Sequence, residues 1–311
     1  MKEIYNLTKE FPEKIRSAYK IDVPRINQGV KRIVVVGMGG CYISGLILRE
    51  FLKKELKIPI EVCQGFFSSD ENDLVILLSY SGNTREVLNA FKKTKNKKDV
   101  LVLTSGGKLL ESAKRNGSYL IKVPLGIHQR FTIAECFFPL LKCLSKSGLI
   151  KNKDRIVEEI VKALKGNEKK LEADAKGLAI KLRSKIPLFY ASEYFYPLAY
   201  RLQTALEEDA KIICHSNKIP ELFHNELEAL PSSHFFPVLI MEGEEIESFK
   251  KQVDFFKRQI KDFYEIDYRR YSREIRMFLI FYFADFLGFY LSKLKNTEMG
   301  ETPLSDKIKR L

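Results

Sequence analysis

Short apolar runs alternate with helix-length segments through the first half of the chain, and this alternation limits the possible folds more than any other feature. Runs this short and this rich in Val, Ile and Leu are typical of parallel strands buried on both faces of a sheet. The predicted strands are Ile33–Val36, Ile58–Cys63, Leu74–Leu78, Val100–Thr104 and Tyr119–Val123. The predicted helices are Ile43–Lys54, Thr84–Lys95, Lys108–Asn116 and Thr132–Leu144. This order predicts an α/β fold with a doubly wound parallel sheet, whose ligand sites lie at the carboxyl ends of the strands.

The second half repeats the α/β pattern more loosely, which predicts a second doubly wound domain of the same kind. Its predicted strands are Leu188–Ala191, Ile212–His215 and Pro237–Met241. Its predicted helices are Pro197–Leu206, Glu221–Leu230, Glu245–Phe263 and Ser272–Leu294. A charged amphipathic helix over Asn152–Ser184, broken near Gly166-Asn167, joins the two halves. A chain of 311 residues suits two domains, and we expect them over residues 1–150 and 151–311.

Composition and charge exclude several classes of protein. The chain is 45% hydrophobic and 30% charged, as in ordinary globular proteins. Its net charge of +13 comes without an RNA-binding, zipper or zinc-finger motif, so we expect no nucleic-acid partner and interpret the positive potential as attraction for small anionic substrates. The longest apolar run, Met277–Leu291, is shorter than a membrane span and contains Asp285. With no apolar segment over Met1–Lys20, we expect a cytoplasmic protein without membrane contact.

The cysteines do not predict a disulfide framework or a metal site. There are five, an odd number, scattered along the chain and never spaced as Cys-x2-Cys. We interpret them as small core residues.

A glycine-rich turn, Gly37–Cys41, follows the first predicted strand and precedes a helix. Glycines there let the backbone approach a ligand, and a helix N-terminus offers N–H groups to an anion. The spacing does not match the dinucleotide fingerprint, since Tyr42 occupies the place of its third glycine, and the sequence contains no phosphate-binding G-x-x-x-x-G-K-[ST] loop. NAD and ATP are therefore disfavoured as cofactors.

A run of hydroxyl residues, Ser79–Thr84, follows the strand Leu74–Leu78 and opens the next helix. Three hydroxyls beside a glycine can supply a phosphate monoester with side-chain and backbone donors, whereas a simple helix cap needs only one hydroxyl. We therefore favour a phosphate site here. Thr104–Lys108 repeats the pattern after the following strand, and there we favour a tight turn.

These motifs together resemble the sugar isomerase (SIS) domain, a phosphosugar-binding module. Further along, Arg201–Lys211 and Pro220–Glu226 resemble the second half of the bifunctional phosphoglucose/phosphomannose isomerases, and the resemblance covers nearly the whole chain. It implies two SIS domains of the αβα-sandwich type. It also implies a homodimer in which a histidine of one subunit completes the site of the other.

The resemblance implies an aldose-ketose isomerase that works on glucose 6-phosphate, and on mannose 6-phosphate, through a cis-enediol without cofactor or metal. Such a reaction needs a carboxylate to move a proton between C1 and C2 and a cation beside the enediolate. By position, Glu208 matches the base, Arg130 the cation, and His224 and Lys309 the ring-opening pair. The implied substrate-binding residues are Gly39, Gly40, Cys41, Ser79, Ser81, Thr84 and Thr302.

The chain departs from the family pattern at three places. Cys41 replaces a serine and loses a strong hydroxyl donor, Gln129 replaces a proline before Arg130, and Glu207-Glu208-Asp209 replaces Asn-Glu-Asn. The added negative charge raises the proton affinity of the base, and Glu207 is the alternative to Glu208 in that role. Two other functions stay open: an isomerase or deaminase of glucosamine 6-phosphate, and a non-catalytic phosphosugar sensor.

Overall fold

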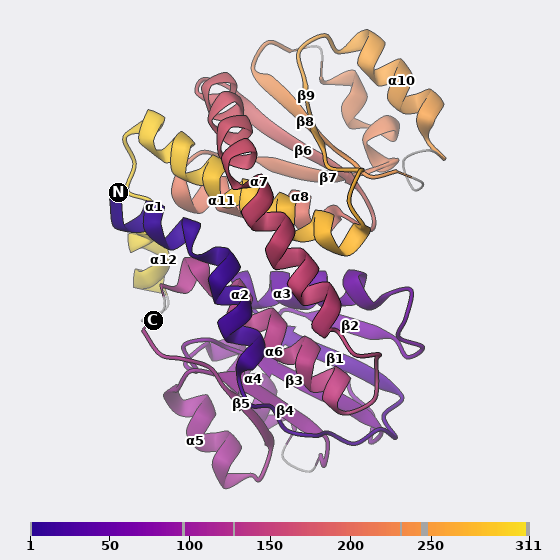
Figure 1. Ribbon diagram of the computed structural model, residues 1–311, viewed down its shortest axis with the longest axis vertical. Coiled ribbons are helices and arrows are strands. Elements are labelled where there is room, and N and C mark those ends of the chain that lie inside the picture. The colour runs from indigo at the N-terminus through magenta and orange to yellow at the C-terminus, as the bar shows by residue number, and fades with distance from the viewer. Residues whose placement is uncertain (1, 95–96, 127, 231, 244–247, 309–311) are drawn as a thin grey trace. The chain divides into compact units, whose positions relative to one another are not determined.

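The computed structural model describes residues 2–94, 97–126, 128–230, 232–243 and 248–308. These form two compact units (Figure 1). The first unit is Glu10–Val161, and the second contains the described residues before and after it in sequence. Both are built on parallel sheets flanked by helices, so the α/β prediction with two doubly wound sheets is confirmed.

The first unit has a five-stranded parallel sheet in the order β2-β1-β3-β4-β5. Its strands are β1 (Arg32–Gly37), β2 (Ile60–Cys63), β3 (Asp73–Leu78), β4 (Val100–Thr104) and β5 (Tyr119–Lys122). Its helices are α2 (Phe11–Lys20), α3 (Gly39–Leu52), α4 (Arg85–Lys92), α5 (Gly107–Arg115), the short 3-10 helix η1 (Gln129–Phe131) and α6 (Ile133–Lys146). The five predicted strands match the observed ones within two residues at each end.

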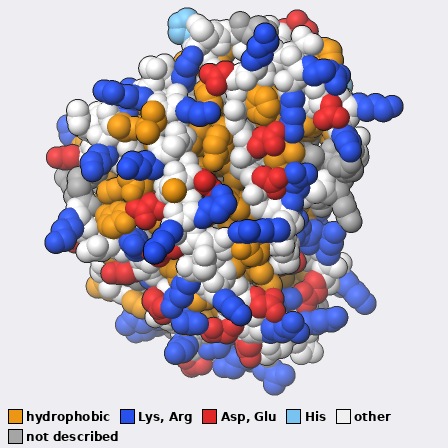
Figure 2. Space-filling model, turned by 45° about the horizontal axis from the view of Figure 1, so that its top comes forward, with side chains coloured by type: hydrophobic (Ala, Val, Ile, Leu, Met, Phe, Trp, Pro, Cys, Tyr) orange, Lys and Arg blue, Asp and Glu red, His pale blue; other side chains and the backbone are white. Residues whose placement is uncertain are grey.

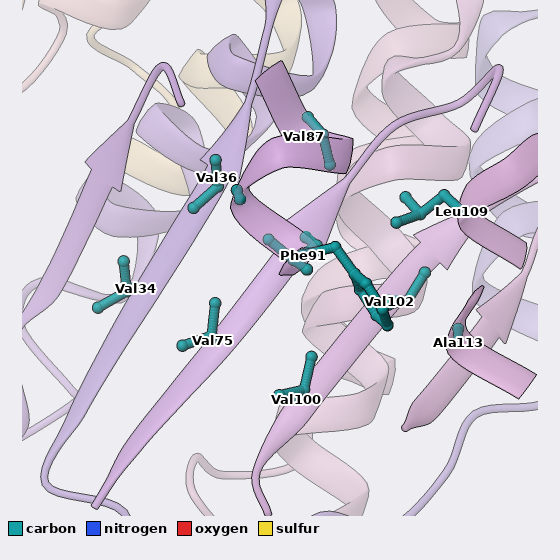
Figure 3. Close-up of a cluster of buried hydrophobic side chains, with 11 residues drawn as sticks. Val34, Val36, Val75, Val87, Phe91, Val100, Val102, Leu109 and Ala113 are labelled. Carbon is teal, nitrogen blue, oxygen red and sulfur yellow. The ribbon is translucent and has the colours of Figure 1, made fainter. Parts of the chain in front are cut away.

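Helices cover both faces of this sheet because successive strand residues point to opposite sides. Val34 and Val102 lie on the face that packs against α4 and α5, where Phe91 and Leu109 complete the cluster (Figure 3). On the opposite face Val35 approaches α3 closely. Each fully buried Val, Leu or Phe contributes roughly 1.5–3 kcal/mol, so the apolar strands are the main source of stability.

The second unit has a four-stranded parallel sheet in the order β7-β6-β8-β9. Its strands are β6 (Ile186–Ser192), β7 (His215–Ile219), β8 (Phe235–Met241) and β9 (Tyr264–Asp267). Its helices are α1 (Lys2–Lys9), α8 (Tyr196–Asp209), η2 (Glu221–His224), η3 (Glu226–Glu228), α10 (Lys250–Gln259), α11 (Arg273–Lys295) and α12 (Pro303–Ile308). The helix α7 (Asp154–Leu182) runs across the division between the units in the sequence.

Several predicted elements of the second half are wrong in their limits. The predicted break near Gly166-Asn167 does not occur, because α7 is continuous and Asn167 Nδ2 donates to the Ala163 carbonyl at 2.7 Å. Strand β7 begins at His215, and the apolar residues before it belong to a loop in which Ile213 is 82% exposed. As an edge strand, β7 has a polar sequence that periodicity does not reveal.

Two predicted helices are also wrong. Glu221–Leu230 forms two short 3-10 helices, since Asn225 leaves helical geometry and its side chain accepts from the Glu226 N–H. The predicted helix Glu245–Phe263 is observed as the shorter α10, followed by β9, a strand that the sequence pattern did not predict. The start of the predicted helix, at 245–247, lies outside the described residues.

Helix α11 is the single described helix long and apolar enough to cross a membrane, but 89% of its most apolar window is buried inside the protein. It packs against α8. Asp285, in the middle of that apolar run, forms an ion pair with Arg201 of α8 at 2.6 Å. The helix is therefore a core element of the second unit.

Candidate functional site

The first unit carries its glycine and hydroxyl motifs where the strand order reverses. Strand β1 lies between β2 and β3, so the chain leaves in opposite directions from the carboxyl ends of β1 and β3. Ligands of open α/β sheets bind in the crevice at this switch point. Gly37–Cys41 follows β1 and Ser79–Thr84 follows β3, so both motifs flank it. Gly39 and Gly40 are exposed there, and Cys41 is 8% exposed in the first turn of α3.

The turn Ser79–Thr84 is held by its own hydroxyl groups. Ser79 Oγ lies 2.7 Å from Thr84 Oγ1 in a hydrogen bond and accepts the N–H of Gly82 at 3.1 Å. Ser79 is buried, whereas Ser81 and Thr84 are half-buried. Ser81 Oγ accepts from the Asn83 N–H at 3.3 Å. The buried Ser79 therefore fixes the shape of the turn, whereas Ser81 and Thr84 keep partial access to solvent at the start of α4.

Two glycines let this turn meet the turn after β4. A Cβ atom at Gly82 would lie 1.8 Å from the Gly106 carbonyl oxygen, and one at Gly107 would lie 2.5 Å from the Ser81 carbonyl oxygen. Both glycines have positive φ, at 67° and 69°. Thr104 Oγ1 donates to the Gly106 carbonyl at 2.9 Å, so its hydroxyl serves the turn itself.

Tyr80 connects the hydroxyl turn to its neighbours. Its carbonyl accepts from Ser105 Oγ at 2.6 Å, and its phenol donates to the Pro124 carbonyl at 3.0 Å. Pro124 begins the loop that leads from β5 to Arg130. Arg130 is 7% exposed, its N–H donates to His128 Nδ1 at 3.3 Å, and its guanidinium lies over the Phe131 ring. A buried cation thus follows the loop that Tyr80 holds.

Glu135, in the first turn of α6, is a buried carboxyl of the same unit. It is 4% exposed, and burial raises its pKa to about 7, although the positive charge of Lys14 opposes the shift. The sequence motifs gave no signal for it.

Glu208 lies at the exposed end of α8, on a firmly anchored backbone. The next residue, Asp209, is fully buried, and a Cβ atom at Gly288 of α11 would lie 2.4 Å from Asp209 Oδ2. Thr297 Oγ1 donates to the Asp209 carbonyl at 2.8 Å. Glu207 instead accepts from Gln203 Nε2 at 3.0 Å and is half-buried. A glycine inside an apolar helix, as at Gly288, is the sequence signal for such close contact.

Lys211 connects the end of α8 to the C-terminal segment. Its ammonium donates to the carbonyls of Glu208 and Glu301, so the residue before Thr302 lies near the backbone of Glu208. Thr302 is half-buried, and its carbonyl accepts the N–H of Asp306 in α12 at 2.9 Å. Lys309 lies outside the described residues.

His224 is exposed at the end of η2, beside an ordered carboxylate. Glu226, two residues later, accepts from Tyr190 Oη at 2.6 Å, from Asn217 and from the ring of His215. Burial and this carboxylate raise the pKa of Tyr190, which therefore stays a donor. The segment that carries His224 is thus held in place two residues later, at Glu226.

The second sheet has its own switch point, between β6 and β8, but a carboxylate of the protein fills it. Glu242 follows β8 and is fully buried. Its Oε1 accepts the Ser192 N–H at 2.7 Å, and its Oε2 accepts from the Ser192 hydroxyl. The donors that would hold an anion after β6 are therefore satisfied internally.

Two further observations concern the distribution of surface charge and the side chains that could bind a metal ion. In Figure 2, Lys and Arg side chains are spread over the visible face among Asp and Glu, which is typical of a solvated surface. Over the part of the chain that the structure describes, no group of three or more His, Cys, Asp and Glu side chains could hold a metal ion.

Two family models match the chain. The SIS domain model covers residues 28–132, and the model of the bacterial phospho-glucose isomerase C-terminal SIS domain covers residues 171–311. The first includes both motifs at the switch point, and the second includes Glu208 and His224.

Curated relatives and solved structures agree with these matches. A bifunctional phosphoglucose/phosphomannose isomerase of Caldicellulosiruptor bescii is 33% identical over 335 residues, covering 98% of this chain and 96% of its own. A D-glucosamine-6-phosphate 4-epimerase of Sulfolobus acidocaldarius is 32% identical over 250 residues, covering 77% of each. The C-terminal domain of the glucosamine-fructose-6-phosphate aminotransferase of Francisella tularensis shares the fold, with a TM-score of 0.75 at 15% identity over 96% of this chain and 98% of that one.

Proposed function

Since the chain belongs to the bifunctional phosphoglucose/phosphomannose isomerase family of phosphosugar isomerases, we propose that it interconverts glucose 6-phosphate and fructose 6-phosphate. We extend the proposal to mannose 6-phosphate, because Thr302 is small enough to admit either C2 epimer. The reaction passes through a cis-enediol and uses no cofactor. We assign the enzyme to the cytoplasm and to a homodimer in which His224 is supplied by the partner subunit.

The anchored position of Glu208 is the observation that carries this proposal. A base that moves a proton between C1 and C2 must be accessible yet held in place. Glu208 is exposed, its backbone is fixed through Asp209 and Lys211, and the competing Glu207 is bound to Gln203. We therefore assign proton transfer to Glu208.

The switch point of the first unit supports phosphate recognition. Ser81 and Thr84 keep partial exposure at the start of α4, where the first N–H groups of a helix have no partner within the helix. Ser79 sets the shape of the turn, and the exposed Gly39 and Gly40 let the backbone approach the sugar. Because Glu242 already occupies the second switch point, we assign one phosphate site to each chain.

We assign the remaining roles to three basic residues, Arg130, His224 and Lys309. Arg130 stabilises the negative charge of the enediolate, since a buried guanidinium acts more strongly on that charge than an exposed one. His224 and Lys309 open the sugar ring as acid and base. A coupled assay of fructose 6-phosphate conversion tests the proposal: turnover that depends on Glu208 supports it, and absence of turnover contradicts it.

Amino-sugar phosphates are a second candidate, and two observations favour them. One relative is a D-glucosamine-6-phosphate 4-epimerase, and the acidic run Glu207-Glu208-Asp209 would attract a 2-ammonium group. Assays with glucosamine 6-phosphate beside the neutral hexose phosphates separate this candidate from the first. A sensor, the third reading, would bind hexose phosphate without exchanging the C2 hydrogen with solvent.

A further inference from the structure

Two cysteine thiols touch beneath the glycine turn of the first unit. Cys41 Sγ, in the first turn of α3, lies 3.7 Å from Cys136 Sγ in α6, and the two helices pack against each other. Cys136 is fully buried, whereas Cys41 is 8% exposed beside the exposed Gly39 and Gly40. A small oxidant can therefore reach the pair from the side of the turn.

The Cys41 sulfur also joins the two motifs of the switch point. Besides the thiol of Cys136, the backbone amide of Tyr80 hydrogen-bonds to it. Tyr80 lies between Ser79 and Ser81 in the hydroxyl turn. Movement of this one sulfur therefore changes contacts of α3, α6 and the hydroxyl turn together.

The two thiols differ in their chemistry. The hydrogen bond from Cys136, aided by the Tyr80 amide, lowers the pKa of Cys41 against the effect of burial. The same hydrogen bond, together with burial and the nearby Glu135, raises the pKa of Cys136. Because Cys41 is also the thiol beside the exposed turn, we assign it as the cysteine that reacts first with an oxidant and the fully buried Cys136 as the resolving cysteine.

We propose that Cys41 and Cys136 form a reversible intramolecular disulfide, a redox modification site that controls ligand binding at the switch point. Hydrogen peroxide is the oxidant. The Cys41 sulfur attacks one peroxide oxygen, the O–O bond breaks, and water leaves, which gives a sulfenic acid. Cys136 then attacks that sulfur and a second water leaves with the Cys136 proton. Two thiols lose two electrons and one hydrogen peroxide becomes two waters; exchange with a small thiol reverses the step.

Formation of the Cys41–Cys136 disulfide requires a movement that changes the geometry of the switch point. A disulfide has its sulfurs about 2.05 Å apart, so the two atoms approach by roughly 1.7 Å from their present contact. This draws Cys41 away from the Tyr80 amide and shifts the turn at Gly39 and Gly40. The effect on ligand binding rests on the proposed function, in which that turn holds the sugar phosphate.

The test uses the full-length protein, treated with hydrogen peroxide, alkylated and mapped by peptide mass spectrometry, with fructose 6-phosphate affinity measured by calorimetry. We expect a linked Cys41–Cys136 peptide that has lost two hydrogens, an affinity at least tenfold weaker, and recovery of both with dithiothreitol. Cys143→Ser, in the same helix, should behave as wild type. Cys136→Ser should bind normally when reduced, form no linked peptide and yield a dimedone adduct at Cys41 after oxidation.

The proposal is overturned if oxidised wild-type protein yields no Cys41–Cys136 peptide, or if the linked protein binds fructose 6-phosphate as tightly as the reduced one. Isomerase activity is assayed in parallel on reduced protein. Reduced protein that binds the ligand without turning it over contradicts the proposed reaction, while the mapping and calorimetry still decide the disulfide. Reduced protein that binds no ligand contradicts both the proposed function and the coupling.

Discussion

Ser79 Oγ and Thr84 Oγ1 lie 2.7 Å apart and close the turn that follows β3. The bond joins the residue that follows β3 to the residue before α4, and Ser79 Oγ also accepts the Gly82 N–H. The turn is therefore shaped before any ligand arrives. Ser81, half-buried between these residues, takes no part in the Ser79–Thr84 bond, and its Oγ accepts only the N–H of the exposed Asn83, at 3.3 Å.

Replacing Ser81 should impair binding without loss of stability. We expect Ser81→Ala to raise KM for fructose 6-phosphate about 10- to 150-fold, since one hydrogen bond to a charged group contributes about 1.5–3 kcal/mol and each tenfold corresponds to about 1.4 kcal/mol. The melting temperature should change little, because water can replace the Ser81 hydroxyl at the N–H of the exposed Asn83. Ser79→Ala should lower both affinity and stability. The buried Gly82 N–H donates to both the carbonyl and the hydroxyl of Ser79, and the substitution removes the hydroxyl acceptor and the bond to Thr84. Steady-state kinetics and thermal melting of the two variants test this. Equal melting temperatures for both would contradict the structural role of Ser79.

Gly82 should tolerate no side chain. We expect Gly82→Ala to destabilise the protein well beyond the roughly 1–2 kcal/mol that positive φ costs an L-residue, because its Cβ would lie 1.8 Å from the Gly106 carbonyl oxygen. Gly117→Ala is the matched control, since Gly117 has φ of 64° and no atom within 4 Å of an added Cβ. Urea unfolding of both measures the difference, and equal losses would mean that the two turns do not meet as described.

The buried ion pair between Arg201 and Asp285 should stabilise the packing of α8 against α11. Their side chains are 5% and 2% exposed, and the Arg201 guanidinium lies 4.5 Å from the Phe281 ring centre. Removing one partner leaves a buried charge, so Asp285→Asn should cost about 3–5 kcal/mol of unfolding free energy. The double variant Arg201→Met/Asp285→Leu should recover much of this loss. A double variant no more stable than Asp285→Asn would count against the pair as the cause.

Glu135 should make stability depend on pH. Its pKa of about 7 in the folded protein lies above the ordinary value, so the folded state binds the proton more tightly than the unfolded state. Stability should therefore be highest when Glu135 is protonated and should fall as pH rises from the unfolded-state pKa through about 7.

Glu135→Gln is the variant that isolates this effect. It should gain stability relative to wild type above neutral pH, on the order of 2–3 kcal/mol at most, and gain little at pH 4. Thermal melting across this range measures it. A gain of the same size at every pH would trace the effect to packing rather than to ionisation.

The first sheet could be predicted from sequence because its strands are apolar throughout, as buried parallel strands must be. In the second unit that signal fails at particular residues. Strand β7 has an edge sequence of mixed polarity, while the apolar Ile212 and Ile213 before it lie in a loop. Asn167, taken as a helix breaker, is instead buried and bound to the Tyr271 hydroxyl at 2.7 Å. These are tertiary contacts, which periodicity along the chain cannot reveal.

The residues of the candidate site also fall into two groups, those that a local sequence motif predicts and those whose position depends on tertiary contacts. Motifs of small and hydroxyl residues mark the switch point because backbone geometry requires them locally, as at Gly82. Besides Lys211, which belongs to the Arg201–Lys211 motif, the contacts that fix the end of α8 come from Thr297 and Gly288, which are distant in sequence from any motif. The filling of the second switch point by Glu242 likewise depends on a partner from another strand, Ser192.

Exchange with solvent of the hydrogen that moves between C1 and C2 is the measurement that tests the central claim most directly. Fructose 6-phosphate is incubated in deuterated water with Glu208→Gln, with its neighbour variant Glu207→Gln and with wild-type protein, and deuterium in the hexose phosphates is followed by NMR. We predict that Glu208→Gln, folded and still binding the ligand, loses exchange and turnover by about 10²- to 10⁴-fold, while Glu207→Gln keeps most of both. Undiminished exchange in folded Glu208→Gln would contradict the account.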